Sequence, residues 1–254
     1  AAAYLISRAP KKAEAAALKA LQMAPEDQTG LSLLGTAWRL MEDGRDDELN
    51  RYDEFVQTFD LEPPSGFSDM AAFCAELDSW LDSQHSDDRE HIDQSLRGGT
   101  QTIGNLFRNG RNTLLDGLRL RIEEAVRRYI AGLPRDERHP FLRRRRQDFQ
   151  FAGSWSSRLK DRGFHTNHVH PAGWISSAFY VALPETTLDS NAREGWIKFG
   201  EPSYDVGLRE PTRRAVQPLV GRLVLFPSYM WHGTVPFHAQ RSRTTIAFDA
   251  VPVG

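Results

Sequence analysis

The stretch that decides the fold is His165–Leu183, which reads HTNHVHPAGWISSAFYVAL. Its second half, WISSAFYVAL at 174–183, is a run of apolar and β-branched residues typical of a buried β-strand. Further short runs of this kind are separated by Gly and Pro, and no helical pattern interrupts them. We therefore expect an antiparallel sheet in a sandwich or a double-stranded β-helix of jelly-roll or cupin-like type. The other runs are one led by Phe149 and Phe151, then GWIKFG at 195–200, GRLVLF at 221–226 and TTIAFDAV at 244–251.

Residues 1 to about 132 have a different texture, with apolar positions that recur every three or four residues, as on amphipathic helices. We expect Ser68 to cap one of these helices and Pro134 to end the last. The polar segment 84–102 contains QSLRGGTQT at 94–102, which we interpret as a loop, either a lid over a site or plain surface. The expected helices span about 13–23, 31–43, 46–59, 68–83 and 112–133.

The order helix, Pro, helix, Gly, helix over residues 1–60 resembles the tetratricopeptide repeat. AEAAALKALQMAPED at 13–27 would be the second helix of one unit, and LLGTAWRLMEDG at 33–44 the first helix of the next. An ordinary helical bundle is the open alternative. Because one repeat cannot bury its own apolar face, these helices must pack on more repeats or on the next domain. The whole is thus predicted as α+β: TPR-like helices at 1–62, a helical segment packing on the barrel at 63–146, and the barrel domain at 147–254.

Composition excludes several classes of function. The chain of 254 residues has 32 Lys and Arg against 34 Asp and Glu, so it offers no general reason to bind nucleic acid. The basic run Arg143–Arg146 is interpreted as a solvated segment. No apolar run reaches the ~20 residues of a membrane span, and the first residues do not read as a signal peptide. With Cys74 as its one cysteine, the chain has no intramolecular disulfide, which favours a cytoplasmic location. It opens without Met inside a repeat-like helix, which leaves open whether it is a fragment.

Three histidines form the candidate metal site. His168 and His170 are two residues apart, so in an extended chain both imidazoles lie on one face. Two such nitrogens bind a transition metal side by side, and iron, zinc, nickel and copper all accept them. His232 follows the strand GRLVLF and is the candidate third ligand. A lone histidine is usually packed or exposed, so the combination carries the prediction. His165 and His238 fit no ligand position and are interpreted as neighbours.

In this order and spacing, residues 147–251 resemble the 2-oxoglutarate–Fe(II) oxygenase family that is distantly similar to prolyl hydroxylases. The resemblance implies an Fe(II)- and 2-oxoglutarate-dependent dioxygenase that uses O2 to hydroxylate a peptide or protein side chain or a small metabolite. The helical part looks like bacterial proteins that pair tetratricopeptide repeats with this domain. The matching stretches are His168-Val-His170-Pro171 with SSAFYV, Leu225-Phe226-Pro227 with Trp231-His232-Gly233, and Arg243 with TTIAF.

The resemblance also implies roles for single residues. His168 would be the first iron ligand and His232 the distal one. Arg243 would pair with the far carboxylate of 2-oxoglutarate, for which a guanidinium is suited. Tyr180 would contact the same carboxylate, and Thr245, on the strand face of Arg243, would add a hydroxyl. Arg241 is the rival to Arg243, and no catalytic residue beyond the metal ligands is expected.

One position departs from the usual pattern. Most such enzymes have Asp or Glu where this sequence has His170, so the site would hold three imidazoles and one negative charge fewer. Either the three histidines bind the metal, or a carboxylate comes from elsewhere, or the site binds metal without turnover.

Substrate residues are the least constrained part of the prediction. Candidates near the site are Trp155, Arg158 and Trp174, together with Arg97 in the Gly-rich segment, although the tryptophans are equally expected in the barrel core. Two other functions stay open: a cupin-like three-histidine metalloenzyme that does not use 2-oxoglutarate, and a non-catalytic TPR scaffold.

Overall fold

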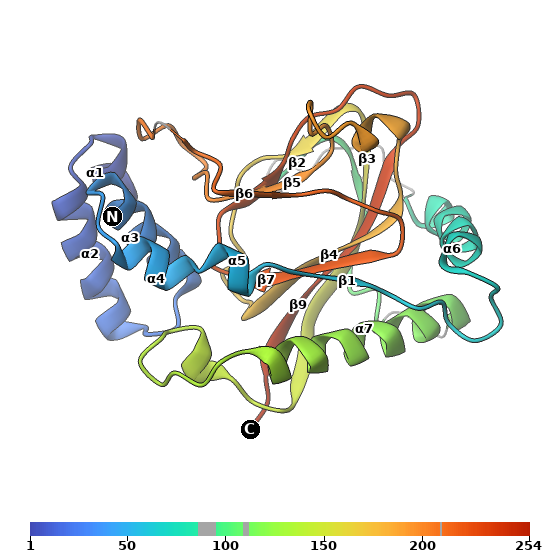
Figure 1. Ribbon diagram of the computed structural model, residues 1–254, viewed down its shortest axis with the longest axis horizontal. Coiled ribbons are helices and arrows are strands. Elements are labelled where there is room, and N and C mark those ends of the chain that lie inside the picture. The colour runs from blue at the N-terminus through green and yellow to red at the C-terminus, as the bar shows by residue number, and fades with distance from the viewer. Residues whose placement is uncertain (86–94, 109–111, 209) are drawn as a thin grey trace.

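The protein is an α+β fold in which a six-stranded and a three-stranded antiparallel sheet are flanked by helices (Figure 1). The computed structural model describes residues 1–85, 95–108, 112–208 and 210–254. The strand order of the large sheet is β1-β7-β4-β9-β3-β2 and that of the small sheet is β6-β5-β8. The strands are β1 (Gln57–Asp60), β2 (Leu96–Gln101), β3 (Phe149–His165), β4 (Ile175–Ala182), β5 (Ile197–Phe199), β6 (Arg214–Val216), β7 (Arg222–Pro227), β8 (His232–Thr234) and β9 (Arg243–Pro252).

Strand β9 shows how the large sheet separates its two faces. Ile246, Phe248 and Ala250 have no exposed surface and belong to the main hydrophobic core. The residues that alternate with them, Arg243, Thr245, Ala247 and Asp249, line a cavity on the other face. Successive side chains of a strand point to opposite faces, so this alternation fixes which side of β9 can carry chemistry.

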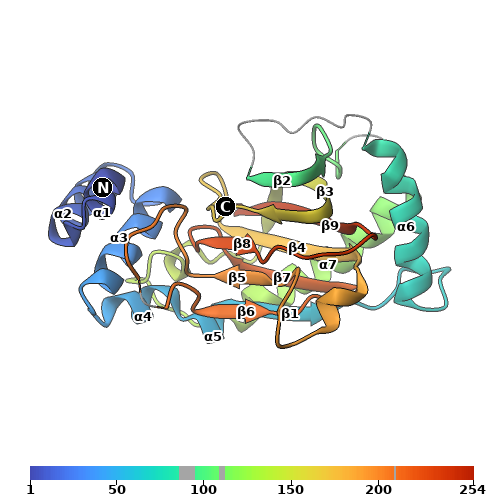
Figure 2. The same cartoon turned by 90° about the horizontal axis from the view of Figure 1, so that it is seen from above.

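Helices surround the sheets (Figures 1 and 2). The N-terminal helices α1–α4 lie at one side of the sheets, α6 at the opposite side, and α7 beneath the large sheet. Asn112 caps α7 by accepting from the backbone N–H groups of Leu114 and Leu115. The helices are α1 (Ala2–Ile6), α2 (Pro10–Met23), α3 (Gln28–Leu40), α4 (Arg45–Asn50), α5 (Tyr52–Phe55), α6 (Met70–Gln84) and α7 (Thr113–Gly132), with 3-10 turns η1 (Leu142–Arg144) and η2 (Glu185–Leu188).

Several expected elements are confirmed, and several details are wrong. The predicted helix 46–59 instead ends at Phe55, and 57–60 is strand β1, which pairs with β7. The Gly-rich segment is not a loop, because 96–101 is strand β2; Gln94 lies outside the described residues. A Cβ at Gly99 would collide with the backbone carbonyl of Arg158, so glycine permits this close pairing with β3. The cap of α6 is Asp69, not Ser68, and strands β6 and β8 were not predicted.

The N-terminal helices dock directly on the barrel. Trp231 donates from Nε1 to Thr36 Oγ1 (3.1 Å), and Arg39 donates to the carbonyl of Gly200 (2.9 Å). The predicted three-part division of the chain stays a prediction, but strands β1 and β2 of the large sheet come from residues before 147. Within the described ranges, no helix combines the length and apolar character that crossing a bilayer requires.

The arginine run at 143–146 is not the solvated segment that we expected. Each side chain donates to a backbone carbonyl, and Arg144 is only 11% exposed. Arg145 bonds Ile130 O near the C-terminal end of α7 (2.8 Å). The run therefore bonds to α7, to the turn between α2 and α3, to the loop before β4 and to the last residue.

Candidate metal and cosubstrate site

His168, His170 and His232 meet between the two sheets, as the sequence predicted. Each offers one ring nitrogen, and these nitrogens all lie within 4.8 Å of one another. His232 opens β8, and a backbone bridge pairs it with His168, which lies in the loop between β3 and β4. It is the one such cluster among the residues that the structure describes.

The second nitrogen of each ring determines what the cluster can bind. The Nδ1 atoms lie 2.7 Å from Thr166 O, 2.6 Å from Asp249 Oδ1 and 2.9 Å from Met230 O, for His168, His170 and His232 respectively. These oxygens only accept, so each Nδ1 carries the proton and each Nε2 keeps its lone pair. The Nε2 atoms of His168 and His170 are 3.1 Å apart. Two lone pairs that face each other at this distance fit a shared cation, because nitrogens bound to one ion at about 2.0–2.1 Å are about 3 Å apart.

Burial keeps two of the three histidines neutral. It lowers the pKa of His168 to about 3, with the neighbouring His170 as a further cause, and lowers the pKa of His232 well below its usual value. At neutral pH, therefore, protons do not compete with a metal ion for the nitrogens of His168 and His232. Neutral imidazole donors suit a borderline transition metal such as iron.

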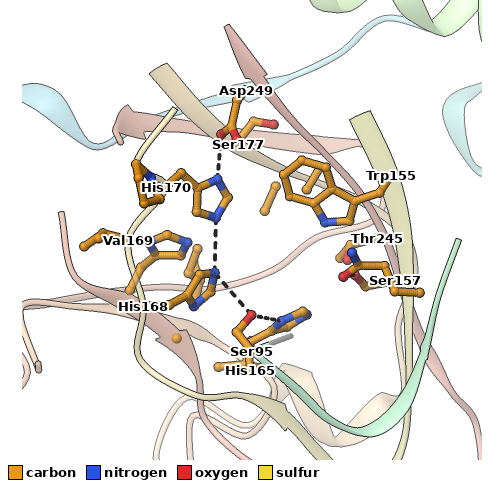
Figure 3. A pocket seen from close by; sticks show the side chains of 18 of the residues that line it. Ser95, Trp155, Ser157, His165, His168, Val169, His170, Ser177, Thr245 and Asp249 are labelled. Atoms are coloured by element: carbon orange, nitrogen blue, oxygen red, sulfur yellow. Dashed lines mark hydrogen bonds and ion pairs between the residues drawn. The ribbon is translucent and has the colours of Figure 1, made fainter. Parts of the chain in front are cut away.

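A cavity of about 260 Å³ extends from the histidines (Figure 3). His168 and His170 form one side, and Trp155, Ser157 and Thr245 lie across from them. His232 lines the same cavity. The strand register explains the second group, since Ser157 pairs with Thr245 and Trp155 with Ala247, all on the inner face.

Arg243 closes one end of this cavity. Its side chain is 2% exposed, and its Nε donates to Gly195 O (3.0 Å). In the described part of the chain, no carboxylate forms an ion pair with it. Burial lowers the pKa of Arg243, and only Tyr180 opposes this effect. A buried guanidinium without an anionic partner is costly, so this end of the cavity is suited to an anion.

Tyr180 lies beside this guanidinium, which is 5.0 Å from the centre of the tyrosine ring. Its hydroxyl is buried beside the Arg243 guanidinium, which can only donate, and no atom of the described residues accepts the hydroxyl proton. The predicted group Arg243, Tyr180 and Thr245 is thus brought together, with Tyr180 paired to Thr245 across β4 and β9. Arg241, the rival to Arg243, is exposed.

Of the four residues that we predicted to contact the substrate, only Trp155 lines the cavity. Trp155 lines the cavity, with its ring 5.5 Å from that of His170. Trp174 does not, because it is fully buried and donates to Phe141 O. Arg158 points to the other face of β3, where it pairs with Asp78 and Asp82 of α6. Arg97 is on β2 and donates to Leu96 O, outside the cavity lining.

The remaining histidines also differ from each other. His165 lines the cavity, with Nδ1 3.2 Å from Ser95 Oγ, and that hydroxyl is 3.4 Å from His168 Nε2. His238 is exposed near Asp161.

Asp249 is the site residue that the sequence interpretation missed. It lies behind His170 and shares the inner face of β9 with Arg243 and Thr245. The two-residue period of that strand was the available signal.

The comparisons with known proteins agree with this site. A family model described as "Putative 2OG-Fe(II) oxygenase" matches residues 153–249, which include all three histidines, Tyr180 and Arg243. Over this segment the chain is similar to that family, which identifies it as an Fe(II)- and 2-oxoglutarate-dependent oxygenase. Among curated protein sequences, none matches the chain.

Several solved structures are similar to this chain. HygX from Streptomyces hygroscopicus, with nickel and 2-oxoglutarate bound, has a TM-score of 0.51 at 11% identity over 80% of this chain and 85% of that one. A Pseudomonas putida prolyl-4-hydroxylase has a TM-score of 0.49 at 15% identity, over 83% and 97% of the two chains. A Trichoplax adhaerens prolyl hydroxylase in complex with a hypoxia inducible factor peptide fragment has 0.49 at 13%, over 84% and 92%. At these identities the likeness concerns the fold alone.

Proposed function

We propose that His168, His170 and His232 hold the Fe(II) of this oxygenase and that Arg243 holds the far carboxylate of 2-oxoglutarate, for hydroxylation of a C–H bond. The observation that carries the proposal is the buried, unpaired guanidinium of Arg243 in the same cavity as the three histidines.

2-Oxoglutarate matches both ends of this cavity. Its keto acid is a metal chelator, and its second carboxylate needs a cation at the far end. Arg243 supplies that cation, and a guanidinium binds a carboxylate through two parallel hydrogen bonds. The Thr245 hydroxyl lines the same cavity, and the Tyr180 hydroxyl lies next to the guanidinium, although Tyr180 is not one of the lining residues. Both are further donors.

When bound, iron and 2-oxoglutarate activate O2 for the oxidation. The chain's own task is to bind, orient and exclude water. The Nδ1–H bonds to Thr166 O, Asp249 and Met230 O hold the three rings with Nε2 toward one point. The walls of β3 and β9 then confine the cosubstrate between these nitrogens and Arg243.

The substrate enters between Trp155 and the loop that carries His168 and His170. Val169, Pro171 and Ala172 of this loop also line the cavity, so the entrance is mainly apolar. It suits a peptide or protein side chain or a small metabolite with an apolar part near the reacting carbon. The α1–α3 region, if tetratricopeptide-like, is the surface that would present a peptide. A cupin-like enzyme that does not use 2-oxoglutarate has no need of Arg243, and a pure scaffold has no need of the histidine cluster.

The test is calorimetric titration of the Mn(II)-loaded protein with 2-oxoglutarate, in wild type, Arg243→Met and Arg241→Met. Arg243→Met removes the buried ion pair between the guanidinium and the far carboxylate of 2-oxoglutarate. It should weaken 2-oxoglutarate binding by at least about 2 kcal/mol, or roughly 30-fold. The Arg241 variant, changed at an exposed arginine, is the control and should bind as wild type. Absence of 2-oxoglutarate binding to metal-loaded wild type would reject the proposal and favour the cupin-like alternative.

A further inference from the structure

We propose that Asp249 is a positioning residue of the metal site, which locks His170 in the metal-binding orientation and supplies the negative charge that three neutral imidazoles lack. The inference rests on the proposed ligand set, not on 2-oxoglutarate. Asp249 accepts from the ring; it does not itself join the cluster of nitrogens that would hold the ion.

The contact with His170 is short and enclosed. Asp249 Oδ1 lies 2.6 Å from His170 Nδ1, and the two side chains are 12% and 10% exposed. Hydrogen bonds in which one partner is ionised are shorter and about twice as strong as neutral ones. Because a carboxylate oxygen accepts this bond, the ring must present its Nε2 lone pair to the metal position (Figure 3).

The carboxylate is itself held in place. Ser176 Oγ donates to the same Oδ1 (2.7 Å) and lies 2.8 Å from Ser228 Oγ. Ser176 is directly opposite Asp249 in the register of β4 and β9. The backbone N–H of His170 donates to the carbonyl of Ser228 (3.0 Å), so the loop and the carboxylate share one support. A Cβ at Gly173 would collide with the Ser228 hydroxyl and approach Asp249 Cγ to 3.3 Å, which explains the glycine there.

Within the described residues, the other two ligands have no charged partner. His168 and His232 donate from Nδ1 to backbone carbonyls, which are neutral. Among the described residues, Asp249 is therefore the one carboxylate in contact with the three rings. A divalent ion bound by three neutral nitrogens keeps its full charge, and a carboxylate one imidazole away makes His170 a stronger donor.

The experiment measures Co(II) affinity and the visible Co(II) absorption of the protein without 2-oxoglutarate. Asp249→Asn keeps an oxygen that can accept from His170 Nδ1 and removes the charge, and Asp249→Ala removes both. Asp46→Asn is the matched control, because Asp46 is also a buried aspartate, 5% exposed, but it bonds Asn50 instead of a histidine. Circular dichroism and metal-free melting check that each variant is folded.

We expect Asp249→Asn to weaken Co(II) binding by about 10- to 100-fold, the usual effect of losing such a partner, with a shifted absorption band. Asp249→Ala should weaken it at least as much, and Asp46→Asn should not. A loss below tenfold in folded Asp249→Asn, or an equal loss in Asp46→Asn, would overturn the inference. His170→Ala separates the two proposals: if it binds Co(II) like wild type, the three-histidine ligand set is itself wrong.

Discussion

Replacing Tyr180 by Phe should have opposite effects on stability and on cosubstrate binding. The Tyr180 hydroxyl is fully buried beside the Arg243 guanidinium, and its proton has no acceptor in the described part of the protein. Burial also raises the pKa of this tyrosine, so the group stays a neutral donor at neutral pH. A buried donor without a partner destabilises the ligand-free protein, whereas a donor aimed at a carboxylate stabilises the complex.

The magnitudes follow from these two states. An unsatisfied buried polar group costs about 1–3 kcal/mol, so Tyr180→Phe should raise the free energy of unfolding of the ligand-free protein by about 1 kcal/mol or more. A hydrogen bond to a charged group contributes about 1.5–3 kcal/mol, so 2-oxoglutarate binding to the metal-loaded variant should weaken by about 10- to 150-fold.

The assay combines urea unfolding of the metal-free protein with titration of the Mn(II)-loaded protein by 2-oxoglutarate. Tyr129→Phe is the control, because Tyr129 is equally buried but donates to Phe55 O at 2.7 Å on the far side of the fold. It should lose about 0.5–1.5 kcal/mol of stability and bind 2-oxoglutarate normally. If Tyr180→Phe behaved in the same way as Tyr129→Phe, its hydroxyl would be satisfied within the protein and the reasoning would be refuted.

Three further predictions concern the rest of the molecule. Burial lowers the pKa of His139, so below about pH 6.5 the unfolded chain binds a proton that the folded chain does not. The free energy of unfolding should therefore fall by up to about 1.4 kcal/mol for each pH unit below that value. Urea unfolding at several pH values should show a shallower fall for His139→Asn than for wild type, and His238→Asn, changed at an exposed histidine, is the control. Arg158→Ala should lower the free energy of unfolding by about 1 kcal/mol, because the ion pairs with α6 are lost, and should leave the affinity for 2-oxoglutarate unchanged. A weaker affinity in this variant would mean that Arg158 contributes to the binding site. Gly99→Ala should lower the free energy of unfolding by at least about 1–3 kcal/mol, because the new Cβ would collide with a carbonyl of β3. Gly132→Ala is the control, because its Cβ meets open space, and it should leave the melting temperature unchanged. Equal effects of the two variants in thermal melts would contradict the close pairing of β2 with β3.

The sequence predicted the parts of the fold that carry a strong local pattern. Strand β4 and helix α7 were found within one or two residues of their ends, because long apolar periodicity dominates there. Strands β1 and β2 were missed, because their residues, QTFD and LRGGTQ, have no alternation and become strands only by pairing with β7 and β3.

The site was predicted where spacing along one extended segment determines geometry. His168 and His170 share a face by their separation alone, and Arg243 and Thr245 do so on β9. Asp249 could not be assigned to His170 in this way, because that contact joins residues 79 apart in sequence. Arg158 was placed in the pocket wrongly: it is one residue away from Ser157 and therefore faces α6.

The most direct test of the account is an anaerobic titration of the metal-free protein with Fe(II) and 2-oxoglutarate, followed by visible absorption, in wild type and in His170→Ala. The account predicts a weak charge-transfer band of the iron–keto acid chelate in wild type that is reduced in the variant. A wild-type protein that binds Fe(II) but gives no such band with 2-oxoglutarate would contradict it.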